Sequence, residues 1–416
     1  MFVEGYFFEV ENVKLYRPGG FHPGDKFHNN RYTVVHKLGY GTFSTVWLVK
    51  DSVTDRYAAL KIIVSELSNI ASEMAVFHHL HSDIDNGDKG YVVHLLDGFE
   101  HHGPNGTHQC IVTEVLGPSV YLDDADLLDH FTTGSIPTNI SKRIATQVSR
   151  GVRYLHRHRV VHGDLYPYNV LLYTDALSSG SSQEDIERYL GKPKKTIFQT
   201  CDTAANPSDS FDPHAPRYLV RNYDPVALWN HCFSDCSYLH VKIADFGEAF
   251  IWSPDDPEIH NSRCARVFAA PELLFENKAS FASDIWALGI VNNLLSDGDV
   301  PFDSHNVVLN MIHWLGPIPS RWYNEWSGRS LLDPPGSEAW IKATQYKESH
   351  NWLRIRNEHA KADLAKGDKI IRRMLEYEPG MRASAQEAVE LFDDFMTGSD
   401  LEWQDYECQA VSASHM

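Results

Sequence analysis

The residues best suited to chemistry lie in one short stretch, VVHGDLYPYNVLL, at positions 160–172. It holds Asp164 and, five positions later, Asn169. A carboxylate there can accept the proton of a hydroxyl group, and the amide can hold a metal ion, whereas His162 is better suited to bracing the loop. These are the tasks of a phosphoryl-transfer loop, but Tyr166 stands where such a loop is expected to hold a lysine.

A glycine-containing turn occurs earlier, in LGYGTFSTVWL at residues 38–48. Gly39 and Gly41 lie where one strand turns into the next, and a turn without side chains lets backbone amides approach phosphate oxygens. Ser44 takes the position where a third glycine is usual. Because the turn lies between strands and not before a helix, a dinucleotide-binding turn is disfavoured. A plain β-hairpin explains the two glycines about as well as a phosphate-binding turn does.

Two more charged residues follow apolar strand patterns. Lys61 lies inside AALKIIV, where a charge needs a partner. The helix expected over residues 66–80 offers Glu73, near its middle, with Glu66 as the second choice. Asp245, in VKIADFGEAF, follows an apolar strand and precedes a glycine, so that its carboxylate can turn toward Mg²⁺ between phosphates.

Composition narrows the class of protein. The chain has 416 residues, 43% of them hydrophobic, with a net charge of −19 and six cysteines. Such a chain suits one large or two medium globular domains in a reducing compartment, and its charge disfavours nucleic acid as a direct partner. We find no secretory signal and no apolar run of the ~18 residues that a membrane helix needs, and therefore expect a cytoplasmic or nuclear protein without membrane contact.

The hydrophobic patterns predict an α+β fold with a small β-rich lobe and a larger helical lobe. We expect an extended N-terminal arm over 1–30, the β-rich lobe over 31–116 and the helical lobe over 117–396. A polar insert at about 174–240 interrupts the helical lobe, and EDIERYLG within it is expected to form a short helix that ends at its glycine. Residues 397–416 are expected to form a tail.

The order of these motifs resembles that of the eukaryotic protein kinases, over roughly residues 31–396. Glycine turn, strand Lys, helix Glu, HxDxxxxN, DFG and AAPE follow one another as in that family. Asp284, in SDIWALG, resembles the aspartate that braces the catalytic loop, and Arg382 resembles the late arginine that pairs with the glutamate of APE, here Glu272. RYTVVHKLGYGTFSTVWLVKD, with YRPGGFHPGDKF before it, is similar to the SR-protein-specific kinases of the CMGC group, especially their fungal relatives.

The resemblance implies the bilobal protein kinase fold, with Mg²⁺ and ATP as cofactors between the lobes. Lys61, held by Glu73, would pair with the α- and β-phosphates, Asp164 would act as base, and Asn169 with Asp245 would hold the metal. The backbone from Glu114 to Leu116 would meet adenine. The residues expected to contact the nucleotide are Leu38, Gly39, Gly41, Thr42, Ser44, Val46, Ala59, Lys61, Thr113, Glu114, Leu116 and Leu172.

By the same resemblance, the chain is a monomeric serine/threonine kinase for basic, Arg/Ser-rich protein segments, with a role in mRNA processing. An acidic surface suits such a substrate. Gly163 replaces the arginine that, in many kinases, receives a phosphate on the activation segment; SR-protein kinases lack that arginine too. Phosphorylation of the segment between Asp245 and Glu272 is therefore not the expected switch.

Two other functions compete with this one. Tyr166 removes a cation from beside the γ-phosphate, which favours a pseudokinase or scaffold unless another cation, such as Lys142 or Arg266, compensates. HGDLYPYN also fits small-molecule kinases of the aminoglycoside or choline type. Those enzymes lack the platform of APE, DxWxxG and late arginine, so Asp284, Glu272 and Arg382 argue against them.

Overall fold

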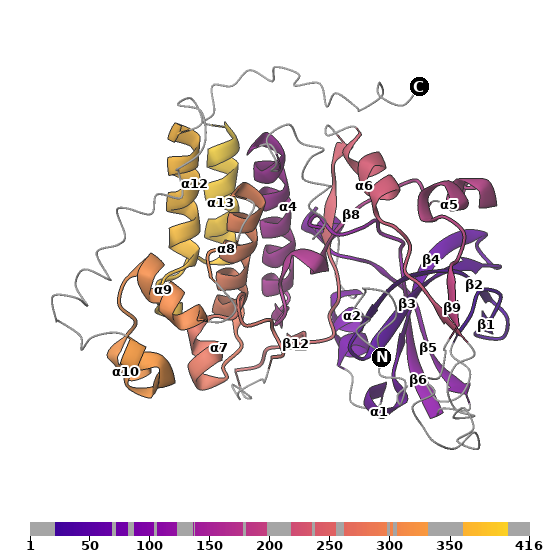
Figure 1. Cartoon of the computed structure of the whole chain (residues 1–416), viewed down its shortest axis with the longest axis horizontal. Helices are drawn as coiled ribbons and strands as arrows, with labels where there is room; N and C mark the ends of the chain where they lie inside the picture. The colour runs from indigo at the N-terminus through magenta and orange to yellow at the C-terminus, as the bar shows by residue number, and fades with distance from the viewer. Residues whose placement is uncertain are drawn as a thin grey trace, which may run out of the picture. The chain divides into compact units, whose positions relative to one another are not determined.

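Figure 1 shows the computed structural model of the chain. By their contacts its residues divide into two units, one drawn from 1–77, 93–118 and 172–235 and the other from the remainder. Each unit is described by itself. The structure describes residues 21–68, 72–81, 87–103, 106–122, 136, 138–177, 180–197, 218–234, 238–254, 262–297, 300–302, 306–331 and 361–397.

The alternating apolar residues predicted as strands form a six-stranded antiparallel sheet in the first unit, in the order β1-β2-β3-β4-β6-β5. Every other side chain of a strand faces the same side, so this pattern supplies one apolar face. The short β1 joins part of the expected N-terminal arm to the sheet. The strands are β1 (Lys26–Phe27), β2 (Tyr32–Gly41), β3 (Ser44–Asp51), β4 (Arg56–Ile63), β5 (Leu95–Gly103) and β6 (Gly106–Thr113).

The core of this sheet is formed by apolar residues from several strands. Trp47, Leu60, Ile62 and Val112 are among its members, each at most 3% exposed. The single helix predicted over 66–80 is instead two, α1 (Ser65–Ser68) and α2 (Glu73–His81), and residues 69–71 between them lie outside the described part.

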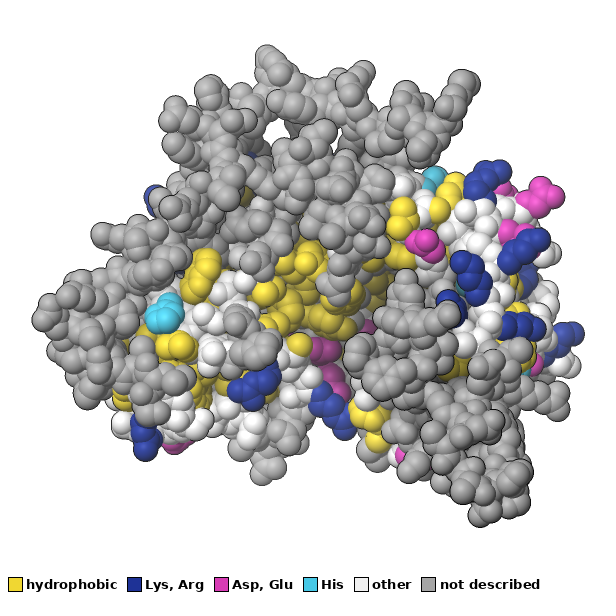
Figure 2. All heavy atoms as spheres, in the orientation of Figure 1, with side chains coloured by type: hydrophobic (Ala, Val, Ile, Leu, Met, Phe, Trp, Pro, Cys, Tyr) yellow, Lys and Arg dark blue, Asp and Glu magenta, His cyan; other side chains and the backbone are white. Residues whose placement is uncertain are grey.

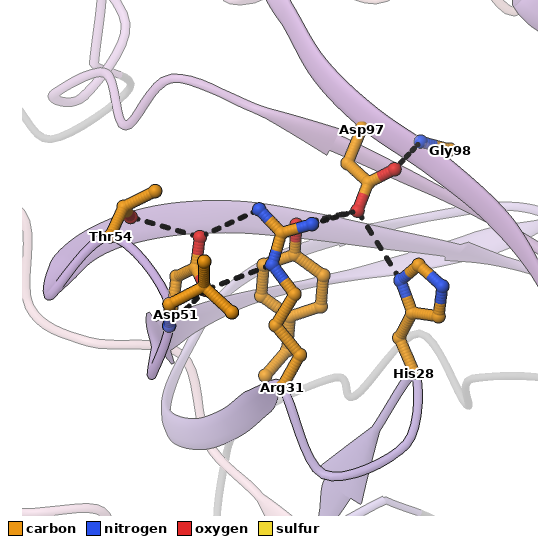
Figure 3. A network of polar contacts seen from close by, with 8 residues as sticks. His28, Arg31, Asp51, Thr54, Asp97 and Gly98 are labelled. Carbon is orange, nitrogen blue, oxygen red and sulfur yellow. Dashed lines mark hydrogen bonds and ion pairs between the residues drawn. The ribbon is translucent and has the colours of Figure 1, made fainter.

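A network of charged side chains ties the start of β2 to the end of β3 and to the start of β5, as Figure 3 shows. The guanidinium of Arg31 donates two hydrogen bonds of 2.9 Å to Asp51 and one of 2.9 Å to Asp97. Asp97 also accepts a hydrogen bond from the hydroxyl of Tyr32 and lies 3.3 Å from Nδ1 of His28. The Arg31 guanidinium lowers the pKa of Asp51 to about 2.

The polar insert contains more structure than the sequence predicted, and it belongs to the first unit. EDIERYLG does form a helix, α5 (Gln183–Leu190), which a capping box starts at Ser182 and which ends at Gly191. The insert also contains a hairpin of β9 (Lys195–Ile197) with β10 (Tyr218–Val220) and a second helix, α6 (Val226–Phe233). Residues 198–217 lie outside the described part.

The insert packs directly on the sheet. Ile186 and Leu190 of α5 and Leu228 of α6 share a buried cluster with Leu48 of β3. Val220 of β10 joins the core of the sheet itself. The insert is therefore a folded part of the first unit, in agreement with the division of the chain by contacts.

The second unit is helical. The spacing of Ile144, Val148, Val152 and Leu155 predicted a helix over 140–156, and this face of α4 is at most 1% exposed. The elements are η1 (Asp88–Tyr91), α4 (Thr138–Arg157), β7 (Val160–Val161), η2 (Pro167–Asn169), β8 (Val170–Leu172), β11 (Val241–Ile243), β12 (Phe250–Ile251), α7 (Pro271–Glu276), α8 (Phe281–Asp297), α9 (Val307–Leu315), α10 (Ser320–Glu325), η4 (Ser327–Leu331), α12 (Lys361–Met374), η6 (Pro379–Met381) and α13 (Ala385–Thr397).

Helix α4 packs against α8 and α13, and α12 completes the group, as the purple, orange and yellow ribbons of Figure 1 show. The strand pairs β8–β11 and β7–β12 support the loops on either side of them. Within the described part of the chain, every helix is too short or too polar to span a membrane. The scaffold therefore fixes two loops, one after β7 and one after β11.

Candidate active site

The lysine in the sheet has the predicted partner. Nζ of Lys61 lies 3.0 Å from Oε1 and 2.7 Å from Oε2 of Glu73, and these side chains are 17% and 3% exposed. Glu73 is the first residue of α2 and does not lie near the middle of a helix, as the sequence predicted. Lys61 faces Val46 on β3 and Ile111 on β6, so that the ion pair is fixed to the centre of the sheet.

The glycine turn joins β2 to β3 as a hairpin, with Gly41 opposite Ser44. A Cβ atom on Gly39 would meet no heavy atom within 4 Å, and one on Gly41 would meet only the Ser44 hydroxyl, at 3.5 Å. The fold itself thus leaves space at these two positions. Next to the turn, the ammonium of Lys37 lies 4.9 Å from the ring centre of Tyr40, and burial lowers the pKa of Lys37 to about 8.

The residues expected around adenine lie in the first unit. Ala59 of β4 pairs with Thr113 at the end of β6, and Ala59 and Leu172 are buried, whereas Leu38 and Val46 are half-buried. Thr42, in the turn, is exposed. Ala59 lies two positions before Lys61 on β4, and Val46 of β3 pairs with Lys61.

The expected hinge is held by its neighbour His94. The amide of Glu114 donates to the carbonyl of His94, and the amide of His94 donates at 2.9 Å to the Glu114 carboxylate. The hydroxyl of Thr113 donates to the carbonyl of Glu114 at 3.2 Å. Leu116, the last residue of the expected hinge, is 7% exposed.

In the second unit, one buried carboxylate braces the loop after β7. Asp284 of α8 accepts hydrogen bonds from the amides of His162, at 2.8 Å, and Gly163, at 3.0 Å. Nε2 of His156 lies 3.0 Å from the same carboxylate. Nε2 of His162 lies 3.1 Å from the carbonyl of Ala244, so that His162 connects this loop to the one after β11. His162 and Asp284 thus have the bracing roles that the sequence predicted.

Three polar residues meet where these loops adjoin. The side-chain amide of Asn169 donates to the carbonyl of Asp164 at 2.9 Å, and the carbonyl of Asn169 accepts from the amide of Ala244, just before Asp245. Asp245 adopts a positive φ of 61°, which turns its backbone away from the strand direction. Across the described residues, no group of three or more His, Cys, Asp or Glu is arranged to hold a metal ion alone.

The electrostatics of the loop make Asp164 an unusual carboxylate. Burial, followed by the negative charges of Asp245 and Glu248, raises the pKa of Asp164 to about 7, against hydrogen bonds from Asn169 and Cys264 that lower it. A carboxylate with such a pKa can accept a proton near neutral pH. The sequence did not predict a role for Cys264, and one cysteine outside a motif gave no signal for it.

Tyr166 lies half-buried among aromatic rings. Its ring centre is 5.6 Å from that of Tyr168 and 6.1 Å from that of Phe268. Burial, then the charge of Asp164, raises the pKa of Tyr166 to about 12, so that it remains a neutral hydroxyl. Lys142, named above as a compensating cation, lies elsewhere, with its ammonium 3.9 Å from the ring centre of Phe395.

The segment after Asp245 is fastened to the loop at Gly163, where many kinases have arginine. Gly163 has a φ of 77°, and a Cβ atom there would lie 2.6 Å from the carbonyl oxygen of Glu248. The hydroxyl of Ser262 donates to the carbonyl of Gly163, and the amide of Arg263 donates to the Glu248 carboxylate at 3.1 Å. Only glycine fits this position, because any side chain would displace the segment.

The predicted pair of Glu272 and Arg382 forms a buried salt bridge at the start of α7. The two Nη atoms of Arg382 lie 2.6 Å from the two carboxylate oxygens, and the side chains are 1% and 4% exposed. The second unit therefore carries the platform that small-molecule kinases of the aminoglycoside type were expected to lack.

Comparison with known proteins agrees with this geometry. The family model described as protein kinase domain matches residues 32–178 and 233–392. The serine/threonine-protein kinase SRPK of Physarum polycephalum is 30% identical over 426 residues, covering 92% of this chain and 90% of that protein.

Two further relatives match over shorter stretches. The protein kinase dsk1 of Schizosaccharomyces pombe is 35% identical over 204 residues, and SRSF protein kinase 3 of Homo sapiens is 37% identical over 172 residues. These matches cover 47% and 39% of this chain, and the chain spans only 35% and 30% of the length of those two relatives.

Fold, motifs and family match define a serine/threonine protein kinase, a class that uses ATP and a divalent metal ion. The chain belongs to the protein kinase family, and within its CMGC group to the SR-protein kinases. The fold class predicted from the sequence, α+β with a β-rich part and a larger helical part, is confirmed.

Proposed function

We propose that this chain transfers the γ-phosphoryl group of ATP, with Mg²⁺, to serine residues in basic, Arg/Ser-rich protein segments. The observation that carries the proposal is the buried ion pair of Lys61 with Glu73, since protein kinases need this pair formed to act on ATP. Lys61 remains 17% exposed while Glu73 is 3% exposed, so that the ammonium is held by its partner and still accessible to a ligand.

The glycine turn fits a nucleotide. Gly39 and Gly41 adopt conformations in which the fold would accept a Cβ atom without a clash. Missing side chains at both positions are explained by the close approach of phosphate oxygens to the backbone. Leu38, Val46 and Ala59 supply apolar contacts for a flat base on the same strands.

The donor set of the second unit fits Mg²⁺. This ion prefers oxygen ligands and is usually bound by one or two protein groups with phosphates and waters completing its shell. Asn169 and Asp245 supply such oxygens. Burial, and after it the charges of Asp245 and Glu248, raise the pKa of Asp164, and a divalent cation would offset the charge of these neighbouring carboxylates.

When bound, Mg²⁺–ATP supplies the phosphoryl group and positive charge beside it. In the proposed mechanism, Lys61, oriented by Glu73, would hold the phosphates of ATP. The carboxylate of Asp164 accepts the proton of the attacking serine hydroxyl, and Asn169 holds the backbone of Asp164 through its 2.9 Å hydrogen bond. These residues act by positioning and by neutralising charge.

The substrate class rests on charge and on relatives. With a net charge of −19, the chain attracts arginine-rich segments. Relatives of this chain include one whose name states an SRSF kinase. We further propose a monomer that acts in the cytoplasm, the nucleus or both, in mRNA processing, without direct contact with nucleic acid.

A phosphate-transfer assay on the purified full chain tests this function. Labelled ATP and Mg²⁺ are incubated with an Arg-Ser repeat peptide, an acidic serine peptide and a proline-directed peptide. We expect the first to be labelled at least tenfold faster, and Asp164→Asn to lower the rate at least about 100-fold. Asp55→Asn, at a side chain that is 86% exposed, is the matched control and should not change the rate.

The outcomes separate the candidate functions. Equal labelling by the natural chain and by Asp164→Asn would reject phosphoryl transfer at this site and favour a scaffold. Faster labelling of the acidic or the proline-directed peptide would leave the kinase activity intact but overturn the proposed substrate class.

A further inference from the structure

The insert builds a cavity of its own in the first unit. Most of the insert, residues 179–232, lies outside both segments that the kinase family model matches. Helices α5 and α6 and the turn after α5 surround a space of about 460 Å³ against β2 of the sheet. This volume falls within the usual range of small-molecule sites, roughly 300–1,000 Å³. The proposed phosphoryl transfer uses none of the residues that line it.

One lining residue is a buried histidine with an unmet hydrogen-bonding atom. His36 of β2 is 2% exposed, and its Nδ1 lies 2.9 Å from the carbonyl of Lys37. A carbonyl only accepts, so Nδ1 carries the proton and Nε2 of the neutral ring offers a lone pair. Nε2 has no partner among the described residues, and an unsatisfied buried acceptor is costly unless a bound group donates to it.

The rim of the cavity is basic. Arg188, Lys192 and Lys194 line it, with Asp224 as the one acidic residue among the lining groups. Arg188 lies 3.6 Å from Asp185 and Lys192 lies 3.7 Å from Glu187, but Arg188 and Lys192 are 67% and 82% exposed. Such exposed pairs are weak and leave both cations available to an anion.

This basic rim contrasts with the acidic chain as a whole, whose net charge is −19. Figure 2 shows Lys and Arg side chains, with a few Asp and Glu side chains among them, over the part of the surface where Figure 1 has α5 and β9. A local concentration of positive charge on an acidic protein selects small anions over cationic ligands.

The walls between rim and histidine are apolar and aromatic. Tyr189, Leu190, Tyr223 and Val226 line the cavity. Leu190 belongs to the buried cluster that fixes the insert to the sheet, and both tyrosines pack against it. The core therefore holds these walls in place, and their apolar and aromatic surface suits an aromatic body.

We propose that this cavity binds a small organic anion with an aromatic body, whose hydroxyl or amino group donates to Nε2 of His36 and whose phosphate or carboxylate meets Arg188 and Lys192. The site is separate from phosphoryl transfer and does not depend on it. The burial that lowers the pKa of His36 keeps its ring neutral and so supports the accepting role.

Isothermal titration calorimetry on the full chain, without nucleotide, tests the site, and variants of the cavity residues distinguish it from the catalytic site. The probes are 4-hydroxyphenyl phosphate and 4-hydroxybenzoate. Hydroquinone lacks the anion, inorganic phosphate lacks the ring, and phenyl phosphate lacks the donor. We expect one saturable site for at least one of the two complete probes, and at least tenfold weaker binding of each incomplete one.

Variants identify the cavity. The double variant Arg188→Gln, Lys192→Gln should weaken binding at least tenfold, whereas Lys278→Gln, an exposed lysine paired with Glu276 in the other unit, should not. His36→Phe should remove the preference for the hydroxylated probe; should this variant not fold, the comparison with phenyl phosphate tests the same contact. The complete probe that binds more tightly shows whether the site prefers a phosphate or a carboxylate. No saturable binding of either, or binding unchanged in the double variant, would overturn the proposal.

Discussion

Arg382 donates a hydrogen bond from each Nη atom to the carboxylate of Glu272, which lies 110 positions earlier in the chain. The carbonyls of Glu376, Ala282 and Tyr377 accept its other three donors, at 2.7, 2.8 and 3.1 Å. All five N–H groups of the guanidinium are thus used. Because the pair is buried, removing one partner leaves an unpaired charge in the interior.

We therefore predict that Arg382→Lys lowers the free energy of unfolding by about 3 kcal/mol, since lysine cannot reproduce the forked geometry. Arg321→Lys is the matched control. Arg321 also binds a carboxylate through two nitrogens, that of Glu378, but the side chains are 46% and 49% exposed. This loss should be below about 1 kcal/mol. Urea unfolding measures both, and equal losses would contradict the argument.

Gly163 gives a second prediction, because its φ of 77° and its contact with Glu248 exclude a side chain. Gly163→Ala should lower the free energy of unfolding by more than about 2 kcal/mol, from backbone strain and a clash together. Gly87 has a similar φ of 87°, but a Cβ atom there would meet nothing within 4 Å, so Gly87→Ala reports the strain alone. Thermal unfolding compares the stability of the two variants. A loss of stability in Gly163→Ala no larger than in Gly87→Ala would show that the segment at Glu248 moves aside without cost.

Motifs whose residues are fixed by chemistry could be predicted from the sequence. The pair of Lys61 with Glu73 follows from the types and order of residues, and the pair of Glu272 with Arg382 follows from the resemblance to the protein kinases. The start of α2 at Glu73 could not be predicted, because a continuous apolar spacing over 66–80 does not reveal where a helix is interrupted.

The polar insert shows a different limit of prediction from sequence. Its polar composition predicted loop, yet a few apolar residues of α5 and α6 bury themselves against Leu48, which lies more than 130 positions earlier in the sequence. Contacts over such a distance leave no local pattern. For the same reason nothing marked His36 as a cavity residue, since alternation along β2 predicts burial of a position and not what covers it.

The raised pKa of Asp164 gives a prediction about stability in the absence of metal. In the folded state Asp164, with its pKa of about 7, keeps this proton up to about pH 7, whereas an unfolded aspartate releases it near its ordinary pKa of 3.8. The folded state therefore binds more protons in this window, and its stability falls as the pH rises from about 4 to about 7. Asp164→Asn, which carries no charge, should escape this loss.

Melting temperatures in a chelating buffer measure the effect. We expect Asp164→Asn to melt several degrees above the natural chain at pH 8 and within about a degree of it at pH 4. Asp55→Asn, at an exposed aspartate, controls for the substitution itself. A difference that is the same at both pH values would refute the link to titration of Asp164.

Tyr166 is expected to limit kcat of the proposed phosphoryl transfer. A lysine at this position would put an ammonium beside the carboxylates of Asp164 and Asp245, whose charges already act on the Tyr166 hydroxyl. A charge-assisted contact in a buried site contributes a few kcal/mol to transition-state binding. We predict that Tyr166→Lys raises kcat at least tenfold and shifts the rise of activity with pH to lower values, because the cation lowers the pKa of Asp164.

Tyr166→Phe is the matched variant, since it keeps the ring against Tyr168 and Phe268 and removes only the hydroxyl. With the Arg-Ser peptide as substrate, its kcat should stay within about threefold of the natural rate, because a neutral hydroxyl supplies little charge. A large loss in Tyr166→Phe, together with no gain in Tyr166→Lys, would mean that the tyrosine hydroxyl itself has taken over the task of the missing cation. Steady-state kinetics between pH 5 and 9 distinguish the two results.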